Sequence, residues 1–261
     1  MKTGCCTGPE NLGALEKAGY DFIDLPGSVV AAMDEESFAR TAERLRRSSL
    51  SCEGFHASVP GSVPLAGPAC DEAAAAAYFA VLCRRAEALG CPRIGIGSPA
   101  ARNIPPGGDR AAHERQFVRV FTAAARTAAA HGVELLLEAM CPAFGNFITS
   151  TAEVLSVLDR AGEPNTAVVL DLFHFLESGE SPEVLDEKTV RRVRYLHIAE
   201  PGGRGYPRPE NLSPYMPVFE RLLARGYAGD RIAVEAPSGD FASGHGPALE
   251  ALRRLAARGE R

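Results

Sequence analysis

The sequence predicts a single (β/α)8 TIM barrel domain that spans residues 1–261. Short apolar runs rich in Val, Ile and Leu alternate with helical patterns along the whole chain. Several of the helical patterns end at a glycine, as α-helices commonly do. The length of 261 residues and a hydrophobic content of 46% suit a barrel of this kind folded as one domain.

The predicted strands are short apolar runs, each with a helical pattern before and after it. Such runs are typical of strands that are buried on both faces, as in a parallel sheet covered by helices. The expected strands cover residues 2–6, 20–26, 50–58, 93–98, 133–139, 166–172, 193–199 and 231–236.

The predicted helices lie between those runs. The segment that begins at Asp34 opens with an acidic N-cap, and the alanine run at residues 73–77 favours a helix through propensity alone. We expect helices over residues 10–19, 34–47, 71–90, 113–132, 213–226 and 246–261.

A doubly wound open sheet is the rival architecture. It would need a glycine-rich phosphate loop that leads from the first strand directly into a helix. Gly95 and Gly97 form a G-x-G, but a loop that contains Pro105 and Pro106 follows them. The barrel is therefore the favoured fold.

Composition and charge narrow the class of protein. The net charge is −5 and the basic residues form no cluster, so we expect no nucleic-acid partner. No stretch approaches the roughly 20 apolar residues that span a bilayer, and the first residues lack the apolar core of a signal peptide. The seven cysteines are odd in number and lack C-x-x-C spacing, which favours reduced thiols and a cytoplasmic location.

Four successive apolar runs end in an ionisable side chain. Each of these would lie at the carboxyl end of a barrel strand, on the face that holds the active site. Burying so many carboxylates requires a partner, and one shared divalent cation is the most economical. A ligand set made mostly of oxygen favours Mn²⁺, with Mg²⁺ or Co²⁺ as alternatives. The four candidate ligands are Glu138, Asp171, His197 and Glu235.

Five segments, in order along the chain, are similar to motifs of one enzyme superfamily. Among them, the D-x-x-H of Asp171 and His174 and the H-x-A-E…R of His197 and Arg204 are the more specific. On these segments the chain resembles the xylose-isomerase-like TIM-barrel superfamily, in its branch of sugar-phosphate isomerases/epimerases and ketose 3-epimerases. The segments are GIGSPAARNIPPG (95–107), LEAMCPAFGNFITS (137–150), LDLFHFLESGE (170–180), LHIAEPGGRGYP (196–207) and AVEAP (233–237).

The resemblance implies roles for individual residues. The four strand-end residues match the metal ligands of the family, while His174 and Arg204 match groups that hold substrate oxygens. Glu138 and Glu235 would also form the acid–base pair on opposite faces of a ketose. One would remove the proton next to the carbonyl and the other would return a proton, through a metal-stabilised enediolate.

The chain departs from the family pattern after Glu138. Where similar proteins carry Asn and a substrate-contacting Glu, this chain has Cys141 and Phe144. An apolar ring cannot accept a hydrogen bond from a sugar hydroxyl, so Phe144 argues against a standard free ketose. His56, at the end of the third strand, is a candidate polar contact or proton carrier, with packing as the alternative. Arg102 is a candidate contact for an anionic or polyol group, or it pairs with a loop carboxylate.

Three functions remain open. The favoured one is a metal-dependent isomerase or epimerase that acts on a small sugar or sugar-like substrate, with a homodimer or homotetramer as the assemblies considered. The second is a lyase or dehydratase that uses the same metal site on a keto-sugar or glycoside, because the flat ring of Phe144 suits an aglycone. The third is a non-catalytic sugar-binding barrel, against which the retention of both candidate bases argues.

The remaining histidines are expected outside the site. His113 and His131 lie within or at the end of a helical pattern and are expected at the surface. His245 falls in the glycine-rich segment SGDFASGHGP, for which we expect a solvated loop, with a phosphate- or product-side loop after the eighth strand as the alternative.

Overall fold

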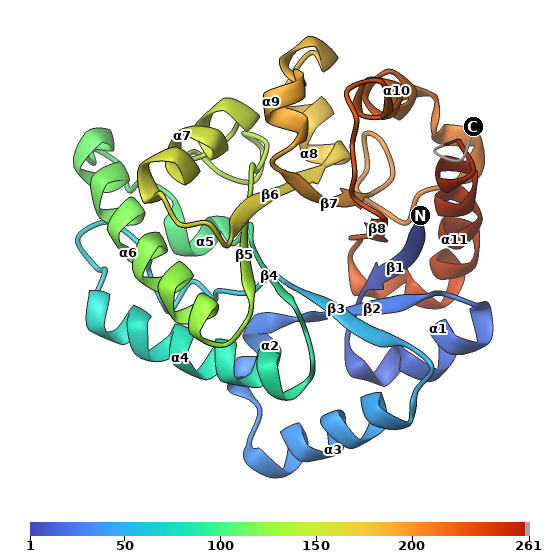
Figure 1. Cartoon of the computed structure of the whole chain (residues 1–261), viewed down its shortest axis with the longest axis horizontal. Coiled ribbons are helices and arrows are strands. Elements are labelled where there is room, and N and C mark those ends of the chain that lie inside the picture. The colour runs from blue at the N-terminus through green and yellow to red at the C-terminus, as the bar shows by residue number, and fades with distance from the viewer. Residues whose placement is uncertain (259–261) are drawn as a thin grey trace.

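Eight parallel strands form a closed ring at the centre of the structure, a computed structural model that describes residues 1–258 (Figure 1). Each strand pairs with the next one along the chain, and the ring closes where β1 pairs with β8. The predicted (β/α)8 barrel is confirmed, and the rival open sheet is wrong. The strands are β1 (Lys2–Cys6), β2 (Phe22–Pro26), β3 (Ser51–His56), β4 (Arg93–Ile96), β5 (Glu134–Glu138), β6 (Thr166–Asp171), β7 (Val193–Ile198) and β8 (Arg231–Val234).

Helices form an outer ring around the strands (Figure 1). The chain alternates between the two rings, which is the arrangement that parallel neighbouring strands require. The helical elements are η1 (Pro9–Asn11), α1 (Leu12–Ala18), α2 (Gly27–Ala32), α3 (Glu35–Arg47), α4 (Glu72–Ala88), α5 (Pro99–Arg102), α6 (Arg110–Ala130), α7 (Thr151–Ala161), α8 (Leu172–Glu177), η2 (Pro182–Val184), α9 (Glu187–Val190), η3 (Pro209–Asn211), η4 (Ser213–Tyr215), α10 (Met216–Ala224), η5 (Ser238–Asp240) and α11 (Phe241–Ala256).

The helix boundaries follow the capping signals of the sequence. The carboxylate of Asp34 accepts a hydrogen bond from the backbone N–H of Ser37, which caps α3 as predicted. Gly19 follows α1 with φ at 88°, a left-handed conformation that glycine adopts without steric cost. These local signals explain why the predicted elements lie close to the observed ones.

Within residues 1–258, the buried apolar residues form three clusters, and two of them make up the core of the barrel. The larger part lies between the strands and the surrounding helices. The smaller part fills the inside of the barrel, where side chains from several strands meet; it comprises Cys6, Phe22, Leu136, Ala167, Val169, Tyr195 and Ala233. The barrel is therefore a packed core rather than a pore, and chemistry is confined to its ends.

The last helix begins earlier than predicted. We expected a solvated loop around His245 and a helix over 246–261, but α11 begins at Phe241, and residues 259–261 lie outside the described residues. The ring of His245 stacks on Phe241 at 4.6 Å, and its Nδ1 donates to the Phe241 carbonyl oxygen at 2.7 Å. A Cβ at Gly244 would lie 2.4 Å from Tyr206, so glycine permits this close packing. Tertiary contacts thus outweigh the low helix propensity of the segment.

His113 is buried, so the prediction of a surface position for it is wrong. The side chain is 4% exposed, and its Nε2 donates to the carbonyl oxygen of Arg102 at 2.7 Å. Its ring also packs edge-to-face on Phe147. The first turn of α6 is covered by the loops that follow β4 and β5, which the helical pattern could not reveal.

All seven cysteines lie within residues 1–258 and are free of disulfides, and all but Cys70 are buried. Within the same residues, none of the helices combines the length and the apolar character that crossing a bilayer requires.

Candidate active site

The four residues predicted at the strand ends meet at one end of the barrel. Each offers a ligand atom, and these four atoms all lie within 4.8 Å of one another. The Nδ1 atom of His197 lies 3.4 Å from Glu235 Oε2 and 3.9 Å from Glu138 Oε1. Asp171 completes the group from β6. The structure thus brings together one side chain from each of four consecutive strands or their ends.

Local structure leaves one oxygen of Asp171 free for this group. Asp171 is the N-cap of α8, and its Oδ1 accepts hydrogen bonds from the backbone N–H groups of Phe173 at 2.7 Å and His174 at 3.3 Å. Its Oδ2 is buried and has no hydrogen-bond partner. The strand-to-helix turn therefore orients the carboxylate and presents one oxygen to the other candidate ligands.

Glycine at position 97 lets Glu138 lie deep in the site. Gly97 follows β4, and a Cβ built there would stand 2.6 Å from Glu138 Oε2. A larger residue would displace the Glu138 carboxylate. The G-x-G of the sequence therefore serves the close approach of a neighbouring side chain rather than a phosphate loop.

The atoms that face one another in this group lack other partners. Glu138 Oε1, Asp171 Oδ2 and His197 Nδ1 are buried and make no hydrogen bond. Leaving several buried polar atoms unpaired costs free energy, unless a ligand satisfies them. Three carboxylates and one imidazole at this spacing fit one divalent cation bound mainly by oxygen.

The two glutamates have opposite proton affinities. Burial, with the negative charge of Glu235 next, raises the pKa of Glu138 to about 8. Burial also opposes ionisation of Glu235, but the neighbouring His197, His56 and Arg204 outweigh it and hold the pKa of Glu235 well below its usual range. Without a cation, Glu138 therefore holds its proton near neutral pH, while Glu235 is ionised.

His56 and Arg204 flank Glu235. His56 Nδ1 lies 3.3 Å from Glu235 Oε1, and Arg204 donates from a terminal nitrogen to Glu235 Oε2 at 3.2 Å. Nε2 of His56 and Nε of Arg204 are left without hydrogen-bond partners. The backbone of Arg204 lies in a tight turn with φ at 53°, where its N–H donates to the backbone carbonyl oxygen of Glu200 at 2.9 Å. Both side chains remain available to substrate oxygens.

His174 lies beside Asp171 with one ring nitrogen engaged. Its Nδ1 accepts from the backbone N–H of Cys141 at 3.4 Å and lies 3.3 Å from the Cys141 sulfur. Nε2 then carries the hydrogen and lies 4.0 Å from Asp171 Oδ2, without a hydrogen-bond partner. Burial lowers the pKa of His174, which favours the neutral imidazole. The neutral ring can donate one hydrogen bond to a substrate oxygen.

Phe144 is the most exposed member of the predicted site. It is 40% exposed, packs edge-to-face on Phe173 and His174, and lies beneath the Arg204 guanidinium at 5.0 Å from its ring centroid. Asp171, by contrast, is 3% exposed. Exposure therefore increases from the buried carboxylate of Asp171 to an aromatic surface beside the site.

Arg102 is not brought to the exposed side of the site. The side chain is 1% exposed and donates to the backbone carbonyl oxygens of Glu138 at 2.8 Å and Ile148 at 3.5 Å. Ile148 has φ at 59°, which is costly for a β-branched residue. Arg102 thus ties together the backbone on which Glu138 stands. The predicted contact between Arg102 and a substrate is still untested, and the hydrogen bonds of Arg102 to backbone carbonyl oxygens do not support it.

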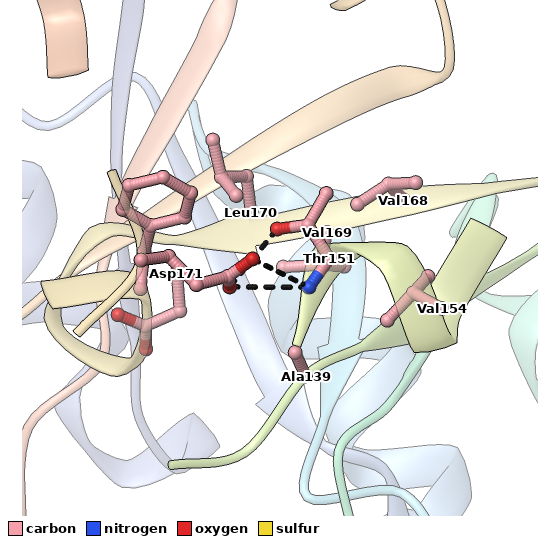
Figure 2. A pocket seen from close by; sticks show the side chains of 9 residues that line it. Ala139, Thr151, Val154, Val168, Val169, Leu170 and Asp171 are labelled. Carbon is pink, nitrogen blue, oxygen red and sulfur yellow. Dashed lines mark hydrogen bonds between the residues drawn. The ribbon is translucent and has the colours of Figure 1, made fainter. Parts of the chain in front are cut away.

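The other side of Asp171 is closely packed. A cavity there has a volume of about 10 Å³. Asp171, Thr151 and apolar side chains of β6 are among the residues that line it (Figure 2). There Thr151 donates from its backbone N–H at 2.9 Å and from its hydroxyl at 3.1 Å to the Glu180 carboxylate. A cavity of this volume holds at most about one water molecule. The side chains packed around this cavity therefore support the end of β6, and the cavity is too small to be a substrate site.

Three polar residues below the site were missed by the analysis of the sequence. They are Asp24 on β2, Tyr195 on β7 and Cys6 on β1, each at most 3% exposed. Asp24 carried a usable signal, because it is a carboxylate inside the apolar run FIDLP. The prediction from the sequence rests only on residues at the ends of such runs.

A match to a protein-family model agrees with the fold and the site. The model for the xylose isomerase-like TIM barrel matches residues 12–258. The chain belongs to this family. The resemblance predicted from the five segments is thereby confirmed.

Several curated relatives of this xylose isomerase-like barrel carry names of sugar or keto-acid enzymes. The human "Putative hydroxypyruvate isomerase" is 29% identical over 177 residues, or 62% of this chain. L-ribulose 3-epimerase of Mesorhizobium japonicum is 30% identical over 106 residues, or 41% of this chain and 35% of that protein. The chain spans about 60% of the length of the human relative.

Solved structures share the barrel over nearly its whole length. D-allulose 3-epimerase from Methylomonas sp. has a TM-score of 0.81 and 21% identity, covering 98% of this chain and 97% of that chain. L-ribulose 3-epimerase has a TM-score of 0.83 and 18% identity, covering 100% of this chain and 96% of that chain. At these identities the likeness shows the fold of the xylose isomerase-like barrel.

Proposed function

We propose that this chain is a divalent-metal-dependent isomerase or epimerase of a small sugar or sugar-like substrate. The observation that carries the proposal is the convergence of three carboxylates and one imidazole with three unpartnered, buried ligand atoms. The names of the relatives, which include a 2-oxo-tetronate isomerase of Pectobacterium atrosepticum, support the same reaction class. Their names differ in carbon number, so the substrate class stays broad.

The proposed site would hold one cation between Glu138, Asp171, His197 and Glu235. A bound divalent cation, with Mn²⁺ preferred and Mg²⁺ or Co²⁺ as alternatives, would polarise the substrate carbonyl and stabilise negative charge on its oxygens. The protein contributes the orientation of the four ligands and a setting from which water is largely excluded.

Glu235 and Glu138 divide the proton transfers. Glu235, ionised and held by His56 and Arg204, takes the proton from the carbon next to the carbonyl. Glu138 returns a proton on the other side, and the reverse reaction exchanges the two roles. The two side chains stand on β5 and beyond β8, so they approach the site from different parts of the ring.

Unpartnered nitrogen atoms would orient the substrate. His56 Nε2, His174 Nε2 and Arg204 Nε lack hydrogen-bond partners and surround the carboxylates. Each can donate to a carbonyl or hydroxyl oxygen, which fixes the carbon that loses its proton next to the base. We propose these three as substrate contacts, in a protein without nucleic-acid or membrane partners.

A product assay tests this function. The chain with Mn²⁺ would be incubated with ketopentoses, ketohexoses, hydroxypyruvate and 2-oxo-tetronate, and products followed by NMR. We expect interconversion of at least one isomer or epimer pair, lost on chelation. A chain with bound Mn²⁺ that converts no member of this panel would contradict the proposal.

The exposed ring of Phe144 favours a second candidate, a lyase or dehydratase on a keto-sugar or glycoside. The ring is 40% exposed and lies next to His174 and Arg204, where it could contact an aglycone. Removal of the same proton would then expel a group from the neighbouring carbon. Release of an aglycone from a 3-keto-glycoside in the same assay would distinguish this reaction.

Metal affinity is expected to depend on pH, because the cation must displace the proton of Glu138. The pKa of this carboxyl is raised to about 8, so affinity should rise by up to about tenfold per pH unit below that value and level off above it. Calorimetric titration with Mn²⁺ between about pH 6 and pH 9 measures this dependence. Equal affinity over the whole range would show that Glu138 is no ligand.

Phe144→Glu is expected to raise kcat/KM on simple ketoses by about tenfold or more, because a hydrogen bond to a charged group is worth about 1.5–3 kcal/mol. Phe144→Leu serves as the control, since it removes the ring without adding an acceptor. If the Glu variant shows no gain over the Leu variant, Phe144 does not determine specificity.

A further inference from the structure

A buried polar layer lies directly beneath His197, on the side away from the candidate cation. It consists of Asp24 on β2, Tyr195 on β7 and Cys6 on β1. Their exposed fractions are 1%, 2% and 3%, so the layer is shielded from solvent. The proposed function uses none of these three side chains.

Asp24 is the centre of this layer. The Tyr195 hydroxyl donates to Asp24 Oδ2 at 2.7 Å, and the Cys6 thiol contacts the same oxygen at 3.8 Å. His197 Nε2 lies 3.8 Å from Asp24 Oδ2 and 3.8 Å from the Cys6 sulfur. The contact between Nε2 and Asp24 Oδ2 is longer than a hydrogen bond, and Asp24 is the acidic side chain beside Nε2 in this layer.

The two nitrogens of His197 face different surroundings. Nδ1 points to Glu138 and Glu235, with no hydrogen-bond partner, whereas Nε2 points to Asp24 and Cys6. A neutral imidazole has one N–H and one lone pair. An acceptor beside Nε2 favours the tautomer that carries its hydrogen on Nε2. Nδ1 then keeps its lone pair, which points to the three carboxylates of the site.

The barrel interior provides the room that this carboxylate needs. A Cβ at Gly54, on the neighbouring strand β3, would stand 3.0 Å from Asp24 Oδ1. A cavity of about 10 Å³ also borders Asp24, Tyr195 and His197. A buried carboxylate costs free energy here, so its presence within an apolar strand calls for a role.

We propose that Asp24 is a positioning residue that holds His197 in the Nε2–H tautomer and directs Nδ1 to the cation. The inference rests on the proposed metal site and deepens it. A carboxylate that accepts from the outer nitrogen of a metal-binding histidine fixes its ring and increases its affinity for the metal. Tyr195 acts one step further away, because its hydroxyl orients Asp24.

Calorimetric titration with Mn²⁺ tests this role without any substrate. Asp24→Asn is expected to lower Mn²⁺ affinity by about 10–100-fold, and Tyr195→Phe to lower it less. Asp21→Asn is the matched control: Asp21 precedes the same strand and accepts from the Thr3 backbone N–H at 2.7 Å, far from His197 along the strand. This variant should bind Mn²⁺ like the wild type, and circular dichroism would verify that each variant folds.

A spectroscopic reading of the wild type makes the test independent of variant stability. In Mg²⁺-loaded protein with ¹⁵N-labelled histidine, His197, assigned with a His197→Gln variant, should show a hydrogen on Nε2 and none on Nδ1. A hydrogen on Nδ1 would overturn the inference.

The remaining outcomes separate this inference from the proposed function. Wild-type affinity in a folded Asp24→Asn variant would overturn the positioning role and leave the metal site intact. Two Mn²⁺ ions per wild-type chain, reduced to one in that variant, would instead make Asp24, Cys6 and His197 a second cation site. Absence of Mn²⁺ binding by the wild type would overturn both proposals.

Discussion

Replacing either glutamate of the proposed acid–base pair is expected to lower turnover by a factor of about 10²–10⁴. Glu138→Gln and Glu235→Gln keep the size of the side chain but remove its ability to exchange a proton. Glu235→Gln should be the more harmful in the direction in which Glu235 is the base, because it is the glutamate whose low pKa keeps it ionised. Turnover would be measured at saturating Mn²⁺, with bound metal determined for each variant.

Glu134→Gln provides the control for these variants. Glu134 begins β5, whereas Glu138 ends it, and Glu134 pairs with Arg93 at 3.6 Å at the opposite end of the barrel. The control should keep near wild-type turnover. If the Glu138 and Glu235 variants fold, bind Mn²⁺ and retain full turnover, the mechanism with two glutamates is wrong.

Removal of the divalent metal is expected to abolish turnover and to lower the melting temperature. A cation that binds only the folded state stabilises it by about 2.7 kcal/mol when its free concentration is about 100 times Kd. For a chain of this length the gain corresponds to about 5–10 °C. Thermal unfolding after chelation, and again after addition of Mn²⁺, measures the effect.

Asp171→Asn sharpens this metal prediction. Asparagine retains the Oδ1 that caps α8, so the variant should fold. It replaces the unpartnered Oδ2 with an uncharged NH₂ group, so the variant should gain less stability from Mn²⁺ than the wild type. Glu134→Gln should respond to Mn²⁺ like the wild type. Purified protein that contains no divalent metal and gains no thermal stability from Mn²⁺ would contradict the shared cation.

The sequence was sufficient to predict the barrel and the meeting of its four strand-end residues. Parallel strands buried on both faces give apolar runs that are easy to recognise, and their carboxyl ends meet by topology. An ionisable residue at the end of such a run therefore has a predictable place. The roles of Glu138, Asp171, His197 and Glu235 as ligands stay predictions, although their geometry agrees with them.

Loop and tertiary contacts could not be predicted in the same way. The left-handed conformation of Arg204 and the burial of His113 depend on segments distant in sequence. The early start of α11 depends on the packing of Phe241 and Tyr206. Asp24 could have been found, since a carboxylate inside a buried strand breaks the apolar pattern as clearly as one at its end.

Exchange of solvent deuterium into a ketose is the most direct test of the central claim. The chain, with Mn²⁺, would be incubated in D₂O with a panel of ketoses, keto-sugars and hydroxypyruvate, and deuterium located by NMR. We predict deuterium on the carbon next to the carbonyl of at least one compound, and loss of this exchange after chelation. Bound Mn²⁺ with no exchange into any compound, or exchange that chelation does not affect, would contradict metal-dependent proton transfer.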